Sequence, residues 1–148
     1  MRRLGQKIGV CAGVVAAATV FAQMPTVELS AGIHLIRAEV AYTFETRAQG
    51  LMFRKALGGP NEGMFFVFPR AEIHCMWMKN TLIPLSVAFL DEKGKVVSIS
   101  DMQPQTETSH CAAAPAKFAL EMSHGWFATK GVRAGATILG LDKAPAAR

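Results

Sequence analysis

His74-Cys75-Met76-Trp77-Met78-Lys79-Asn80-Thr81-Leu82-Ile83-Pro84 is the densest run of unusual side chains in the sequence. Its first half predicts a strand, on which successive side chains point to opposite faces: His74, Met76 and Met78 to one, and Cys75, Trp77 and Lys79 to the other. Pro84 lacks an N–H and keeps Ile83 away from helical angles, so we expect a turn from Asn80 onward. The polar residues of this run therefore lie at a strand end.

Strand patterns flank this run on both sides. Residues 34–42 alternate between apolar and polar side chains, and 64–68 are continuously apolar up to Pro69. We expect the strand over 64–68 to pair with the central run. Residues 85–90 and 95–101 predict a hairpin, and 117–122 a strand with Glu121 opposite to its apolar face. The pattern indicates a mainly β fold, a small single-domain β-sandwich or distorted barrel with one or two short helices.

The clearest helix pattern follows Thr43, a residue type that caps helices. Phe44, Ala48, Leu51 and Met52 form one apolar stripe at helical spacing. Gly50 lies inside this helix, so either something packs closely on it or the helix ends nearby. A second short helix is expected over 126–130, and residues 103–116, which contain Cys111, predict a long surface loop.

The first 22 residues have the features of a secretory signal peptide. Arg2, Arg3 and Lys7 precede an apolar segment, and Val20-Phe21-Ala22 resembles a cleavage site. A membrane anchor is the alternative, but the apolar run is shorter than the ~20 residues that a spanning helix needs. We therefore expect a signal peptide over 1–22, a single β domain over 23–141 and a flexible tail over 142–148, in a periplasmic or secreted protein.

Removal of the signal peptide changes the charge balance. The whole chain has 16 basic and 11 acidic residues; without Arg2, Arg3 and Lys7, 13 basic and 11 acidic residues remain, a net charge of +2. No basic block remains, so nucleic-acid binding is not expected.

Two cysteines remain after cleavage, Cys75 and Cys111. An even pair in an exported protein predicts a disulfide. Two buried thiols or a soft-metal pair are the alternatives.

Several motifs taken together resemble one known family. They are Thr46-Arg47, Gly50-Leu51-Met52-Phe53-Arg54, Gly63-Met64-Phe65-Phe66-Val67-Phe68, Trp77-Met78-Lys79-Asn80-Thr81 with Ile83-Pro84-Leu85, and Leu120-Glu121. Over about residues 34–140 the chain is similar to the domain of unknown function 192 family. This resemblance implies a small, mainly β fold, often exported, without a settled activity. The chain departs from the family pattern at Ser86 and at Gly135-Ala136, where many relatives have a carboxylate.

Five polar residues are candidates for ligand binding, because polar groups on a small β scaffold can converge on a ligand. They are Arg47, Lys79, Asn80, Thr81 and Glu121. The structural alternative is that Asn80 and Thr81 shape a turn and that Arg47 and Glu121 form an ion pair or bond to loop carbonyls.

Metal and catalytic sites have weaker support. His74, Met76 and Met78 suit Cu(I), with His110 and His124 as further donors, although methionines commonly fill cores. No zinc-site spacing or hydrolase motif occurs, and no cofactor is expected. Asp101 and Glu121 could perform acid and base chemistry if they meet, and Trp77 and Trp126 could stack on sugar rings.

The sequence thus favours a non-catalytic ligand-binding or interaction module of the cell envelope, with a small molecule, a glycan or an envelope protein as its partner. We expect no membrane span after signal cleavage. A hydrolase or lyase that acts on an envelope glycan and a copper-binding protein are the alternatives.

Overall fold

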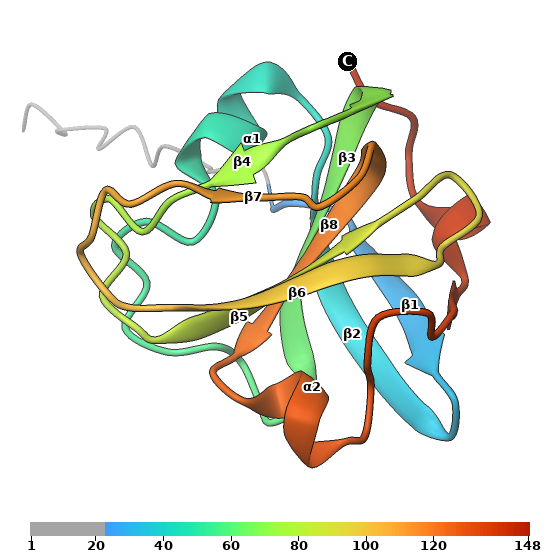
Figure 1. Ribbon diagram of the computed structural model, residues 1–148. Coiled ribbons are helices and arrows are strands. Elements are labelled where there is room, and N and C mark those ends of the chain that lie inside the picture. Colours follow the sequence, from blue (N-terminus) through green and yellow to red (C-terminus); the bar gives the residue numbers. More distant parts are fainter. Residues whose placement is uncertain (1–22) are drawn as a thin grey trace, which may run out of the picture.

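The structure, a computed structural model, describes residues 23–148 (Figure 1). The predicted signal peptide lies outside the described residues. The strands are β1 (Thr26–Ala31), β2 (His34–Ala41), β3 (Glu62–Glu72), β4 (Cys75–Met76), β5 (Leu85–Leu90), β6 (Val96–Met102), β7 (His110–Cys111), β8 (Ala116–Ser123) and β9 (Ile138–Leu139). The helices are α1 (Phe44–Gln49), α2 (Trp126–Thr129) and the 3-10 helix η1 (Leu141–Lys143). The predicted mainly β fold is confirmed.

Seven of the described strands form one sheet, in the order β6-β5-β8-β3-β2-β1-β9. Neighbours are antiparallel except β2 and β3, which are parallel and are joined by α1 and a long loop. The sheet curls until its two ends meet: Lys95 forms a bridge with Thr137, and the Ile138 N–H donates to the Gly94 carbonyl at 2.8 Å. Of the two predicted architectures the barrel is the closer description, because the sheet is a curled half-barrel.

Both faces of this sheet are buried, because the central strands carry apolar residues on both sides. The first core draws on every strand of the curled sheet and includes Leu29, Ile36, Phe65, Leu120 and Ile138. The second core lies on the other face and includes Met64, Phe66, Phe89, Ala119 and, from the covering loops, Leu51, Met78 and Ala112. The segments after α1 and around β4 and β7 therefore cover one face of the sheet.

The central run differs from its prediction. Its strand, β4, spans only Cys75–Met76 and pairs with β7, not with β3. The physical reason is that both edges of β3 are already occupied, by β2 and β8. β4 and β7 form a separate two-stranded sheet beside α1 (Figure 1).

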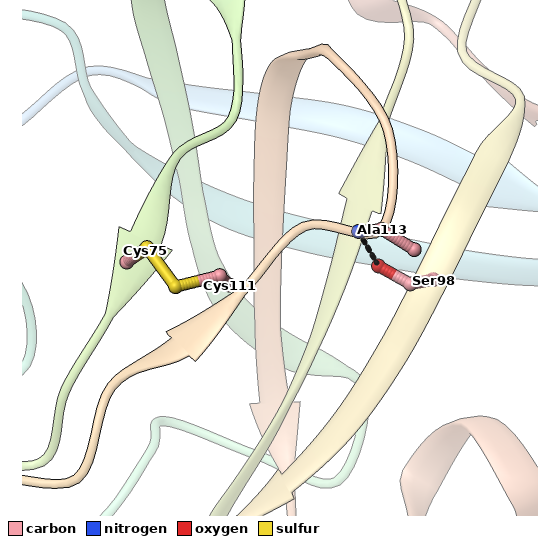
Figure 2. Close-up of a disulfide and its surroundings, with 4 residues drawn as sticks. All are labelled: Cys75, Ser98, Cys111 and Ala113. Atoms are coloured by element: carbon pink, nitrogen blue, oxygen red, sulfur yellow. Dashed lines mark hydrogen bonds between the residues drawn. A yellow bond between two sulfur atoms is a disulfide. The ribbon is translucent and has the colours of Figure 1, made fainter.

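A disulfide between Cys75 and Cys111 joins β4 to β7, as predicted. The two cysteines are direct cross-strand partners with their Cα atoms 3.9 Å apart. Figure 2 shows the bridge and, beyond β7, the Ala113 N–H that donates to Ser98 Oγ of β6 at 3.1 Å. The predicted loop over 103–116 is therefore interrupted by a strand and held at two points.

The first helix is shorter than predicted and ends at Gln49. Thr43 caps it as expected: its Oγ1 accepts from the Thr46 N–H at 3.2 Å. Both expectations for Gly50 are met, since it has φ +49° at the helix end and a Cβ there would lie 3.3 Å from the Phe66 ring. The predicted apolar stripe is buried only at Leu51, whereas Phe44 is 73% exposed. The stripe faces a pocket rather than a closed core.

The hairpin of β5 and β6 forms as predicted. The last residues, which the sequence predicts to be a tail, make defined contacts: η1 begins at Leu141, and the Arg148 N–H donates to the Tyr42 carbonyl at 2.8 Å. No helix within residues 23–148 is long and apolar enough to cross a membrane.

Candidate functional site

A pocket of about 310 Å³ lies between α1, β3, β4 and β8. Its walls are mostly apolar or aromatic and include Phe44, Leu51, Met52, Phe66, Phe68, Met76 and Trp77. The disulfide reaches this wall through Cys75. Three of the predicted site residues line it as well: Arg47, Thr81 and Glu121. An apolar cavity with a few convergent polar groups is the usual form of a small-molecule site.

The register of the central strands places Glu121 in this pocket. Glu121 is paired with Met64 of β3 and with Val87 of β5. Because side chains alternate along β8, Leu120 and Met122 enter the first core and Glu121 points with Ala119 to the second. Gly63 allows the close approach, since a Cβ there would collide with the Glu121 carbonyl oxygen. Glu121 is only 3% exposed.

In the described chain no hydrogen-bond donor or positive charge stabilises the charged form of the Glu121 carboxyl group. Desolvation by burial raises its pKa to about 8, and no hydrogen bond or neighbouring charge acts against that shift. No polar side-chain atom of the described residues is both enclosed and unbonded, so the carboxyl oxygens face the pocket that Glu121 lines. Near neutral pH this group keeps its proton and can donate or accept a hydrogen bond.

Arg47 lies on α1 with its guanidinium donors directed to backbone carbonyls. Nη1 donates to the Tyr42 oxygen at 2.6 Å and to the Val67 oxygen at 3.1 Å, and Nη2 donates to the Arg148 oxygen at 3.2 Å. Desolvation lowers its pKa. The predicted alternative of bonds to carbonyls therefore describes Arg47, which fastens α1 to β3 and to the chain end while it forms part of the pocket wall.

Thr81 is 5% exposed and closes the turn after the central run. Its N–H donates to the Met78 carbonyl at 3.1 Å, and its Oγ1 donates to the Lys79 carbonyl at 3.2 Å. The hydroxyl oxygen keeps its acceptor capacity. Thr81 is thus a second polar group in the pocket wall.

The other two predicted site residues do not line the pocket. Asn80 is exposed in the left-handed region with φ +54°, and its carbonyl accepts from the Phe53 N–H at 2.8 Å. The Lys79 ammonium lies 3.8 Å from Glu107 and 5.2 Å from the centroid of the Trp77 ring. Asn80 serves the turn, as its structural alternative states, and Lys79 stands outside the pocket beside one of its walls.

The weak copper candidates lie in different surroundings, although Met76 and His110 are cross-strand partners on β4 and β7. His74 stacks on Phe68, with ring centroids 3.8 Å apart, and its Nε2 lies 3.0 Å from the Arg70 carbonyl oxygen. Met78 is fully buried in the second core, whereas Met76 lines the pocket. Within residues 23–148 no cluster of three or more His, Cys, Asp or Glu side chains could hold a metal ion.

Asp101 and Glu121 do not meet. Asp101 is paired with Ser86, which donates to its carboxylate at 2.5 Å. Glu121 is paired with the next residue of β5, Val87, so the two acids point to opposite faces of the sheet. A pair of carboxylates is therefore absent from the described pocket wall.

Sequence reasoning missed most of the apolar wall. Phe66 and Phe68 belong to a continuous apolar run, whose pattern does not distinguish a core from a pocket. The available signal was Phe44 and Trp77, two large apolar residues next to polar candidates; they are 73% and 46% exposed. Trp126, the other candidate for sugar stacking, is buried in the first core.

Known proteins of similar sequence and structure give a family but no activity. The DUF192 family model, described as "Uncharacterized ACR", matches residues 26–140. A Novosphingobium aromaticivorans protein of unknown function is 33% identical with a TM-score of 0.73, over 91% of this chain and 99% of its own. A Sinorhizobium meliloti protein described as a candidate transcription regulator is 31% identical with a TM-score of 0.72, over 78% of this chain and 92% of its own. No curated protein matches. The chain therefore belongs to the uncharacterised DUF192 family.

Proposed function

We propose that the protein is an exported, non-catalytic binding module of the cell envelope that holds a small, largely apolar ligand in the pocket above Glu121. One observation carries this proposal: a carboxyl group that is 3% exposed and has no offsetting partner faces an apolar pocket of about 310 Å³. Burial disfavours the charged form of this carboxyl group. A ligand that supplies the partner offsets that penalty on binding.

Export is supported by the composition of residues 1–22 and by the disulfide, which persists in oxidising compartments. The test is expression of the whole chain in a bacterial host, followed by intact mass measurement of the periplasmic extract. We expect a chain that begins at Gln23 and gains alkylated thiols only after reduction. Recovery from the cytoplasm of the uncut chain with all three cysteines, Cys11, Cys75 and Cys111, as free thiols contradicts export.

The pocket argues against a two-carboxylate glycan hydrolase. Glycoside hydrolysis commonly uses two carboxyl groups on either side of the bond. Glu121 is the one acidic side chain among the described residues that line the pocket. We therefore favour binding over hydrolysis.

The Sinorhizobium meliloti protein is described as a candidate transcription regulator. The charge of residues 23–148 does not favour a DNA-binding surface in this chain. Sequence-independent contacts with DNA need clustered Lys and Arg side chains. Residues 23–148 carry 13 basic and 11 acidic side chains, which leaves little excess positive charge. A small molecule or envelope component remains the proposed partner.

Binding is tested with methionine methyl NMR on residues 23–148. Met52 and Met76 line the pocket, whereas Met122 is enclosed in the first core and serves as an internal control. Three probes of one shape are titrated: phenethylamine, 2-phenylethanol and 3-phenylpropionate. We expect at least one to shift Met52 and Met76 and to leave Met122 in place. No shift at either pocket methionine with any probe contradicts the proposal.

A further inference from the structure

We propose that the ligand of this pocket is an organic ammonium ion, an amine carried on a small apolar or aromatic body. This inference rests on the proposed function and names its ligand class. The pocket combines one acidic group at its inner end with a wall of rings and thioethers, and a cation with an apolar body matches both parts.

Glu121 lacks a countercharge in the part of the chain that the structure describes. Glu121 is enclosed by the second core, and the described residues place no cation against its carboxyl group. A buried carboxyl group without a countercharge keeps its proton, whereas a cation beside it favours the carboxylate. A ligand ammonium would supply three N–H donors and a positive charge at the place where the chain supplies neither.

Aromatic residues form much of the pocket wall. The rings of Phe44, Phe66, Phe68 and Trp77 line the pocket. Aromatic faces attract cations within about 6 Å of the ring centroid. Trp77 already does so in this structure, since the Lys79 ammonium lies 5.2 Å from its centroid. A wall of this kind favours an ammonium over an anion or a neutral hydroxyl.

Arg47 is the other charged group that lines the pocket. It would favour an anion, but three of its five N–H donors are directed to the carbonyls of Tyr42, Val67 and Arg148 and hold the guanidinium in the wall. An anionic ligand would also give Glu121 no countercharge. Arg47 therefore does not define the ligand class, and Glu121 does.

Binding of an ammonium ion should release a proton from Glu121, and this makes the affinity depend on pH. Near neutral pH the carboxylic acid must release its proton when the ammonium binds, because the bound pair is carboxylate and ammonium. From β3, β5 and β8 the neighbours of Glu121 are apolar, and Arg47 is the one other charged group that lines the pocket. Because the pKa of Glu121 is about 8, linkage predicts that the ammonium ion binds nearly ten times more tightly at pH 7 than at pH 6.

The experiment measures dissociation constants of the three probes at pH 6, 7 and 8, with the same methionine signals as readout. We expect phenethylamine to bind most tightly, with an affinity that rises nearly tenfold from pH 6 to pH 7. In Glu121→Gln we expect at least tenfold weaker binding and no pH dependence. Glu28→Gln, a change at an exposed acid on β1, is the matched control and should bind as the unchanged protein does.

The outcomes separate the two proposals. If 2-phenylethanol or 3-phenylpropionate binds as tightly as phenethylamine, or if the amine's affinity does not change with pH, the ligand class is wrong and the binding function stands. If no probe shifts Met52 or Met76, both proposals fail. Trp77→Leu gives a second variant that leaves Glu121 in place. We expect this variant to bind phenethylamine about two- to fivefold more weakly and with the same pH dependence. Unchanged affinity would contradict the role of the aromatic wall.

Discussion

Adjacent residues of β8 face opposite sides of the sheet and meet different surroundings. Leu120 is fully enclosed in the first core by apolar side chains from the whole curled sheet. Glu121 is almost as buried, but on the side that opens into the pocket. The first core adds stability by burying apolar surface, whereas the second core contains an acid that reduces it. The comparison teaches that burial alone does not distinguish a core position from a site.

The largest effect that would sharpen this comparison is the pH dependence of stability. In the folded protein the pKa of Glu121 is about 8, against 4.5 for the ordinary group. Between these values the unfolded chain releases a proton that the folded protein retains, so stability falls as the pH rises. The loss reaches about 4–5 kcal/mol above pH 8.

Glu121→Gln cannot ionise and should lose this decline. Urea unfolding at pH 5 and pH 9 is the measurement, and we expect the variant to be much more stable than the unchanged protein at pH 9 and similar to it at pH 5. Glu28→Gln is the control for a change at an exposed acid. If the free energy of unfolding changes with pH in the same way for the unchanged protein and for Glu121→Gln, Glu121 ionises freely in the folded protein. Its surroundings would then not differ from those of an exposed acid.

The next effect concerns the disulfide, which holds the cover of the second core. Cys75 and Cys111 are 36 residues apart. The chain-entropy model gives a loss of about 4 kcal/mol when such a loop is opened. We expect the double variant Cys75→Ser, Cys111→Ser to unfold at a lower urea concentration, in keeping with this loss of free energy. The methyl signal of Met76 should broaden, and that of Met122 should stay sharp. Equal broadening of both signals would show that the two cores do not respond separately.

A somewhat smaller effect is expected in the first core. Leu120 is fully buried, so Leu120→Ala removes apolar contacts and leaves a cavity. The free energy of unfolding should fall by about 3 kcal/mol. Phenethylamine binding to the folded variant should keep its pH dependence, because Glu121 remains in place. A loss of that pH dependence would mean that the first core also shapes the pocket.

The sequence predicts most strands of the large sheet, because alternation is a local signal, and it predicts the disulfide from an even cysteine pair in a chain expected to be exported. The sequence predicts the strand β8 with Glu121 on the side opposite to its apolar face. It does not predict that the side that carries Glu121 is buried as well. The reason is that the cover comes from distant segments, around Leu51, Met78 and Ala112. Alternation shows which side a residue faces and not what lies on that side.

Sequence patterns name the candidate site residues one by one, but they do not show which of them share a pocket. Arg47, Thr81 and Glu121 come from separate segments and meet at the pocket. Lys79 and Asn80 directly precede Thr81 but do not line the pocket, and Asn80 is itself the left-handed residue of this turn. Pairing of the central run with β3 was also wrong, since the two edges of β3 are taken by strands that lie far apart in the sequence.

The smallest effect is expected at Lys79, the exposed neighbour of the pocket. Its side chain is 47% exposed, and its ion pair with Glu107 spans 3.8 Å between two exposed groups. Exposed pairs of this kind contribute about 0–1 kcal/mol, so Lys79→Ala should change the free energy of unfolding by less than about 1 kcal/mol at either pH. Urea unfolding of this variant beside Glu121→Gln is the direct comparison. A Lys79→Ala effect as large as that of Glu121→Gln, or one that grows with pH, would show that the exposed polar residues of the central run and the buried acid belong to one electrostatic unit.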